Sequence, residues 1–299
     1  MIAMALACEP DLLIADEPTT ALDVTIQAQV LDLLRELQRT RGMSMLLITH
    51  DLGVVAGTAH RVGVMYAGQI VEAAACKAFF GNPQHPYSRK LFASLPARRK
   101  RGEMLSVIGG NVPSLAQEFI GCRFTERCDY AQAPCTSVAP ALTPSGSARA
   151  VRCHLYTGVL GNPGLPAEET AIAPAVPSKA GGEVPAGAAA PVEPLLAVTD
   201  LRVHFPIQKG LLRRVAGYVR AVDGVSLSIP AGHTLALVGE SGCGKTTVGK
   251  GVLQLLRATG GEALFDGIDL AQLSSGALRA HRRDFQIVFQ DPYSSLNPR

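Results

Sequence analysis

A phosphate-binding pattern begins where an apolar run ends in the last third of the sequence. Thr234–Val238 leads into Gly239-Glu-Ser-Gly-Cys-Gly-Lys-Thr246, the G-x-x-x-x-G-K-[ST] pattern between an expected strand and an expected helix. Glycines let successive backbone N–H groups converge on a phosphate, and a helix N-terminus favours an anion. Lys245 is predicted to reach the β- and γ-phosphates, and Thr246 to offer its hydroxyl to Mg²⁺. The predicted nucleotide-binding residues here are Gly239, Glu240, Ser241, Gly242, Cys243, Gly244, Lys245, Thr246 and Thr247.

A second group of reactive side chains lies near the start of the chain. The apolar run Leu12–Ala15 ends in Asp16 and Glu17, and the next such run ends just before His50. A carboxylate at the tip of a buried strand suits Mg²⁺, which prefers oxygen donors, so Asp16 is a predicted part of the magnesium site. Glu17 is predicted to polarise an attacking water. The spacing of His50 from the acidic pair favours a catalytic role over a purely structural one.

Alternating strands and helices must position these groups. Leu12–Ala15, a helix over 24–39 and Met43–Thr49 form an expected βαβ unit of a parallel sheet. Strands at Leu195–Val203, Val225–Ile229 and Thr234–Val238 precede a helix from about 245 to 257. The helix over 24–39 is expected to present one apolar face, made of Ile26, Val30, Leu33, Leu34 and Leu37.

Composition divides the chain into four stretches and excludes several protein classes. The expected divisions are an α/β stretch over 1–95, a cysteine-bearing stretch over 96–160, a Pro/Ala/Gly-rich linker over 161–194 and a second α/β stretch over 195–299. Apolar residues make up 47% and charged residues 18%, which argues against bulk disorder. A net charge of +3 argues against a dedicated nucleic-acid binder. No apolar run approaches the roughly 18 residues of a membrane span.

Four of the seven cysteines fall within about thirty residues of the second stretch: Cys122, Cys128, Cys135 and Cys153. In a chain expected in the cytoplasm, such a group favours metal or cluster ligation over disulfides. Four thiolates suit an iron–sulfur cluster or tetrahedral zinc, although the spacing lacks the paired C-x₂-C of zinc ribbons. Plain reduced cysteines remain an alternative. The basic run over 98–101 is expected to be a solvated turn.

The acidic and glycine-rich motifs together resemble the ATP-binding subunits of ABC transporters. Leu12–Pro18 resembles their Walker B strand, and Gly239–Thr246 resembles Walker A. The resemblance implies an α/β P-loop NTPase fold with a RecA-like core. It further implies a D-loop role at the nucleotide for Asp23, a γ-phosphate-sensing role for His50, contact with Mg²⁺ and the attacking water for Gln290, and adenine stacking for Phe205, for which core packing is the simpler alternative.

Three further stretches are similar to the ATPases of oligopeptide, dipeptide and nickel importers: Arg61–Glu72, Asn82–Tyr87 and Gln290–Arg299. The resemblance implies ATP and Mg²⁺ as cofactors and ATP hydrolysis that drives import of peptides or related solutes. It implies transmembrane permease subunits and, indirectly, an external solute-binding protein as partners, with no nucleic acid, and a place on the inner face of the cell membrane. The cysteine stretch resembles the C-terminal extension of these ATPases, for some of which a four-iron (4Fe-4S) cluster is implied.

The motifs stand in an unusual order. In the family each domain runs from Walker A to Walker B, whereas here the Walker B half comes first. The simplest expectation is an internal piece of a fused tandem ATPase, in which 1–95 ends one domain and 195–299 begins the next. The glycine-rich signature loop is not found in the 299 residues. We therefore expect nucleotide binding with little hydrolysis unless a second ATPase domain supplies that loop. The alternative function is a soluble, non-transport ABC ATPase acting on nucleic acid or ribosomes.

Overall fold

The structure is a computed structural model. It describes residues 2–20, 22–95, 107–146, 148–158, 164–165, 193–210 and 214–290. Most of the expected linker over 161–194 and the basic run over 98–101 lie outside these residues, as do Ala21 and 291–299.

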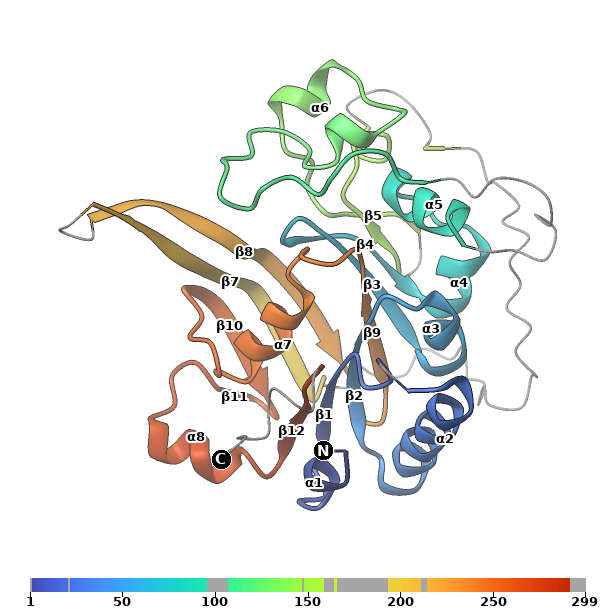
Figure 1. Ribbon diagram of the computed structural model, residues 1–299, viewed down its shortest axis with the longest axis vertical. Coiled ribbons are helices and arrows are strands. Elements are labelled where there is room, and N and C mark those ends of the chain that lie inside the picture. The colour runs from blue at the N-terminus through green and yellow to red at the C-terminus, as the bar shows by residue number, and fades with distance from the viewer. Residues whose placement is uncertain are drawn as a thin grey trace.

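The centre of the fold is a mixed eight-stranded sheet in the order β12-β1-β2-β9-β3-β4-β6-β5 (Figure 1). The first five strands pair in parallel and the remaining pairs are antiparallel. Strands β1, β2 and β9 are buried along their whole length, as expected for parallel strands covered on both faces. The bounds are β1 Leu12–Asp16, β2 Ser44–Thr49, β3 Arg61–Tyr66, β4 Gln69–Ala75, β5 Thr143–Pro144, β6 Ala150–Val151, β9 Thr234–Val238 and β12 Phe285–Val288.

The two α/β stretches of the sequence interleave in this one sheet. Strand β9, from the last hundred residues, lies between β2 and β3, from the first hundred. Strand β12, also from the last hundred residues, pairs with β1 at Leu12–Ala15. The sequence left open whether the two α/β stretches pair with each other, and in the structure their strands share one sheet.

A second, antiparallel sheet packs across the first in the order β11-β10-β7-β8. Its strands are β7 Leu196–Lys209, β8 Arg214–Ile229, β10 Gly260–Phe265 and β11 Ile268–Asp269. Helix α7 (Lys245–Val252) packs against strands of both sheets. Two of its glycines permit this close packing, because a Cβ on Gly249 would lie 3.1 Å from side-chain atoms of Ile14 and Ile48, and one on Gly251 would lie 3.0 Å from Val203. A continuous apolar core fills the space between the sheets.

The remaining helices flank the sheets. Helices α2 (Val24–Arg41), α3 (Leu52–Thr58) and α4 (Cys76–Gly81) lie on the side of the central sheet away from α7 (Figure 1). Helix α5 (Pro86–Ala93) follows, α1 (Ile2–Leu6) precedes β1, and α8 (Ser275–His281) precedes β12. In the part of the chain that the structure describes, no helix is both long enough and apolar enough to cross a bilayer.

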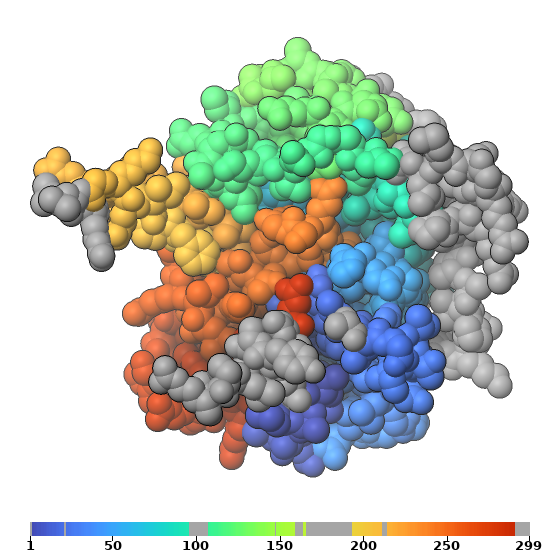
Figure 2. All heavy atoms as spheres, viewed as in Figure 1, coloured from blue at the N-terminus to red at the C-terminus, as the bar shows by residue number. Residues whose placement is uncertain are grey.

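The cysteine-bearing stretch contributes β5 and β6 to the edge of the central sheet next to β4, and it also contains a short 3-10 turn η2 (Thr125–Arg127) and helix α6 (Ala133–Ser137). We call this stretch, expected over 96–160 and described at 107–146 and 148–158, the extension. Figure 2 shows its green atoms directly against the orange atoms of the C-terminal stretch. The extension is therefore in contact with both halves of the ATPase-like core.

Three sequence expectations need correction. Strands β7 and β8 are much longer than expected because they pair with each other as a hairpin from Leu196↔Ile229 to Lys209↔Arg214. Helix α7 ends at Val252 rather than near 257. On α2, Leu34 is 1% exposed but Leu33 is 49% exposed, so the buried stripe is narrower than the predicted face.

Candidate functional site

The glycine-rich loop between β9 and α7 is shaped by close backbone contacts. Gly239 has φ +153° and Gly244 has φ +106°, values that residues with side chains rarely adopt. A Cβ on Gly239 would lie 2.2 Å from the carbonyl oxygen of Met65, and one on Gly244 would lie 2.1 Å from that of Ala221. The loop is thus held against the end of β3 and the middle of β8, and only glycine fits at these two positions.

Lys245 lies at the start of α7 with its ammonium group folded back over the loop. Its Nζ donates to the carbonyl oxygens of Gly239 at 2.8 Å and Glu240 at 3.0 Å, and the residue is buried. The cation therefore already stands at the mouth of the loop, where phosphate oxygens could replace these carbonyls as its partners. Cys243 is fully buried beneath it, and burial raises the pKa of its thiol.

The carboxyl end of β1 meets the start of α7. The Thr246 hydroxyl donates to Asp16 Oδ1 at 3.1 Å, although 230 residues separate them. Burial raises the pKa of Asp16, a shift that the Thr246 hydrogen bond opposes and neighbouring Glu17 reinforces. The pair supplies hydroxyl and carboxylate oxygens, the donor types that Mg²⁺ prefers.

Glu17 connects the remaining polar groups of the site. Its Oε1 lies 3.1 Å from His50 Nδ1, and its Oε2 accepts from Gln290 Nε2 at 3.0 Å and from the Thr20 hydroxyl at 3.0 Å. Burial acts to raise the pKa of Glu17, but the hydrogen bonds from His50 and Thr20 outweigh it and the net pKa is lowered. Its backbone has φ +48°, a strained conformation of the kind found at functional sites. Glu17 is therefore held ionised and fixed in orientation.

Parallel topology explains why these residues meet. Strands β1, β2, β9 and β12 run in the same direction, so the groups that follow them gather at one edge of the sheet. Glu17, His50, the glycine-rich loop and Gln290 each follow one of these four strands.

Four predicted nucleotide-binding residues make none of the contacts described above. Asp23 caps α2, accepting hydrogen bonds from Thr25 N at 3.0 Å and Ile26 N at 2.9 Å. Phe205 lies on the β7–β8 hairpin and is 38% exposed, so simple core packing does not describe it. Ser241 is exposed and Thr247 half-buried. The nucleotide roles of these four residues remain predictions.

The sequence does not reveal three residues that support the loop. Arg127 of the extension pairs with Glu240, and the backbone N–H of Glu240 donates to the hydroxyl of Tyr87 at 2.8 Å. Tyr66 packs between them, with its ring 4.7 Å from that of Tyr87. More than a hundred residues separate Arg127 from Glu240, so no local pattern signals the contact.

The four clustered cysteines come together in the extension. Cys122, Cys128, Cys135 and Cys153 all line one pocket of about 10 Å³, beside His85 and His154. Burial raises the pKa of Cys128 to about 11 and that of Cys153 to about 12. Among the residues that the structure describes, no group of three or more His, Cys, Asp or Glu side chains is placed to hold a metal ion.

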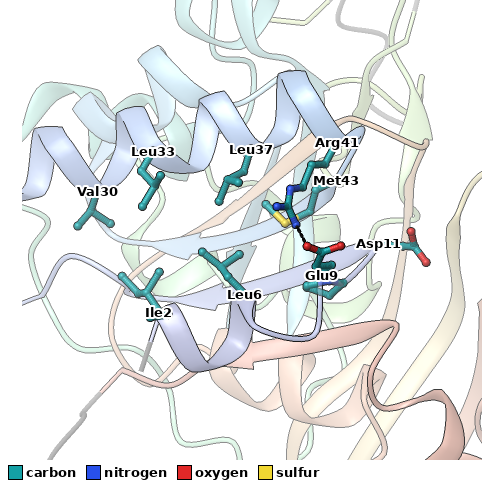
Figure 3. Close-up of a pocket in the computed structure, with 11 residues that line it drawn as sticks. Ile2, Leu6, Glu9, Asp11, Val30, Leu33, Leu37, Arg41 and Met43 are labelled. Atoms are coloured by element: carbon teal, nitrogen blue, oxygen red, sulfur yellow. Dashed lines mark ion pairs between the residues drawn. The ribbon is translucent and has the colours of Figure 1, made fainter.

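A larger cavity of about 760 Å³ lies away from these sites, between α1 and α2 (Figure 3). Leu33 and Leu37 of α2 point toward Ile2 and Leu6 of α1, and an ion pair closes one end, with Arg41 Nη1 2.7 Å from Glu9 Oε1. None of the phosphate-site residues lines this cavity.

Two family models match parts of the chain. The model described as "Oligopeptide/dipeptide transporter, C-terminal region" matches residues 71–135. The model described as "ABC transporter" matches residues 222–299, which include the glycine-rich loop. The two matches fall on the extension side and on the phosphate side of the fold, respectively.

Curated relatives align along the whole chain. Glutathione import ATP-binding protein GsiA of Pectobacterium atrosepticum is 44% identical, and the proteins of the same name from Escherichia coli K12 and Shigella sonnei are 40% identical, each over 299 residues. These alignments cover 100% of this chain but 38% of each relative, so the chain spans less than half of their length. By its two family matches and these relatives, the chain is similar along its whole length to ABC transporter ATP-binding proteins of the oligopeptide/dipeptide type.

Proposed function

We propose that the chain binds ATP with Mg²⁺ in one composite site built from its first and last hundred residues. The observation that carries this proposal is the 3.1 Å hydrogen bond between Thr246 of the glycine-rich loop and Asp16 of β1. It brings the two halves of a P-loop site together in the geometry that the family chemistry requires. In an intact tandem ATPase each half would instead complete a different site.

Each group has a defined task in this site. The loop amides and Lys245 bind the phosphates, and Phe205 stacks on the base. Asp16, Thr246 and Gln290 organise Mg²⁺, which when bound neutralises charge on the phosphate oxygens. Ionised Glu17 accepts a hydrogen bond from the attacking water, and His50 and Gln290 orient that carboxylate. Asp23, which matches the family's D-loop, acts at the nucleotide.

We further propose that hydrolysis by this chain alone is slow. In the ABC family the signature loop of an opposing domain closes over the γ-phosphate, and the sequence contains no such loop. A chain with ordinary steady-state ATPase activity that Glu17→Gln abolishes would contradict this part of the proposal.

The relatives' names suggest the physiological setting. They are described as glutathione import ATP-binding proteins, so we propose that this chain energises import of peptides or related small solutes. Its partners would be transmembrane permease subunits, a second ATPase domain and, indirectly, an external solute-binding protein, and it would lie at the inner face of the cell membrane. The family match over 71–135 disfavours the alternative role on nucleic acid or ribosomes.

The domain assignment is likewise a proposal: 1–95 and 195–299 as half-domains, 96–160 as the importer-type extension and 161–194 as the linker. An iron–sulfur cluster in the extension is proposed as well, supported by four thiols that share one pocket. Iron and sulfide analysis of anaerobically purified protein tests this, and zinc or no metal would contradict it.

Nucleotide retention tests the main proposal directly. Purified protein should bind labelled ATP in the presence of Mg²⁺, and Lys245→Ala should reduce that binding by at least about ten-fold because a charge-assisted phosphate contact is lost. Lys77→Ala, at an exposed position on α4, is the matched control and should bind ATP like the unaltered chain. Equal binding by the Lys245 variant and the control would refute the proposed site.

A further inference from the structure

An arginine from the extension forms an ion pair with a residue of the glycine-rich loop. Arg127 Nη1 donates to Glu240 Oε2 at 2.7 Å and Nη2 donates to Oε1 at 2.9 Å, a bidentate pair. The Arg127 side chain is 7% exposed and that of Glu240 is 24% exposed, so water screens the pair only in part. Bidentate arginine–carboxylate pairs are among the strongest and most directional contacts in proteins.

Other contacts hold Arg127 itself in place. Its Nε donates to the carbonyl oxygen of Gly109 at 2.8 Å, and Nη1 also donates to the Tyr66 hydroxyl at 3.2 Å. Its guanidinium carbon lies 5.7 Å from the centre of the Tyr66 ring. The backbone oxygen of Arg127 accepts from Lys90 Nζ at 2.7 Å. These contacts fix the guanidinium before any ligand arrives.

Glu240 is in turn the second residue of the loop, and three contacts restrain it. Its side chain meets Arg127, its N–H donates to Tyr87 Oη and its carbonyl accepts from Lys245 Nζ. An unpaired carboxylate at this position would repel the charges of a triphosphate. Pairing with Arg127 both removes that repulsion and holds the loop backbone.

We propose that Arg127 is a positioning residue for the glycine-rich loop, through which the extension raises the loop's affinity for a nucleoside triphosphate. This proposal rests on the nucleotide site proposed above and adds to it a residue from outside the ATPase core. Arg127 acts through Glu240 and does not itself touch the phosphates. The extension thereby becomes part of the apparatus that sets nucleotide affinity.

The first test is a charge-based comparison. Arg127→Met should weaken ATP binding by about ten-fold and AMP binding much less, since repulsion by the freed Glu240 carboxylate grows with phosphate charge. Adding Glu240→Gln to Arg127→Met removes that carboxylate and should restore the part of the ATP affinity that is lost to this repulsion, while the part lost because the loop is no longer held remains missing. Arg39→Met breaks a bidentate pair of the same kind with Glu36 on exposed α2, and should leave both affinities unchanged.

A second measurement does not need nucleotide. Hydrogen exchange of the amides over 240–245 should be faster in the Arg127→Met protein than in the unaltered chain, with exchange over β1 and β2 unchanged. If the variant folds poorly, Arg127→Lys serves instead, because lysine keeps the positive charge but cannot form the two parallel hydrogen bonds of the guanidinium group. Unchanged loop exchange, or equal loss of ATP and AMP binding with no recovery in the double variant, would overturn the proposal. Absence of ATP binding in the unaltered chain would instead refute the proposed function and leave the exchange test decisive.

Discussion

Replacing Asp16 by asparagine should change stability and ligand binding in opposite directions. Asp16 is 1% exposed at the end of β1, and burial raises its pKa. A carboxyl group whose pKa is higher in the folded chain than in the unfolded chain stabilises the fold while it is protonated, and that stabilisation is lost as the pH rises through the folded pKa. At neutral pH the ionised Asp16 carboxylate therefore lowers the free energy of unfolding of the nucleotide-free protein.

The substitution Asp16→Asn changes mainly the charge of this side chain. Asparagine has nearly the same shape and can still accept the Thr246 hydrogen bond, so packing and pairing are largely preserved. Because burial raises the pKa of Asp16, we expect Asp16→Asn to increase the free energy of unfolding at neutral pH. The same change should weaken Mg²⁺-dependent ATP binding about 10- to 100-fold, as is typical when an oxygen partner of a metal site is removed.

Urea denaturation without nucleotide, at about pH 4 and at about pH 7, measures the change in unfolding free energy. ATP titration with and without Mg²⁺ measures the change in ATP affinity. The stability gain should shrink toward the acidic condition. Asp32→Asn is the control, because Asp32 is exposed on α2 in a surface pair with Arg35. A less stable Asp16→Asn protein at neutral pH, or unchanged Mg²⁺ dependence, would refute the reasoning.

Three further predictions concern the surroundings of the site. Leu34→Ala should cost about 2–5 kcal/mol in unfolding free energy and exposed Leu33→Ala under about 1 kcal/mol, measured by urea denaturation; similar costs would contradict the burial pattern. Gly244→Ala should lower both ATP affinity and thermal stability, because the added Cβ would lie 2.1 Å from the Ala221 carbonyl oxygen, and a variant with normal affinity would show that the loop can move aside. The lowered pKa of Glu17 stabilises the fold above the unfolded pKa and that contribution is lost as the pH falls through the folded value, so Glu17→Gln should flatten the acid limb of the stability profile.

The local structure around the candidate site residues could be predicted from sequence because it depends on short patterns. Thr234–Val238 forms the expected strand with identical bounds, and the loop that follows connects it to α7 as expected. Asp16 ends a buried strand and Glu17 follows it, as the apolar run before them predicts. The family resemblance is likewise confirmed by the matches over 71–135 and 222–299. These features need only residue type, spacing and backbone propensity.

Long-range partners could not be predicted in this way. The predicted apolar face of α2 included Leu33, but a helix can show an apolar stripe wider than its neighbours cover, and α1 leaves a cavity there. The length of the β7–β8 hairpin depends on pairing between strands whose outer residues are exposed, so hydrophobic runs mark only its buried half. The sequence also supplied no sign of Arg127 at the phosphate loop.

The sequence by itself determined which groups can bind phosphate and magnesium, since a glycine-rich loop and a strand-end carboxylate carry their chemistry in a few adjacent residues. Only the tertiary structure decided that these groups lie next to each other. Strand β9 lies between β2 and β3 because both of its edges form backbone hydrogen bonds there and its apolar side chains are buried on both faces of the sheet. This packing does not depend on where in the chain its neighbours occur. Strand order in a parallel sheet is a property of that packing, and chain order does not reveal it.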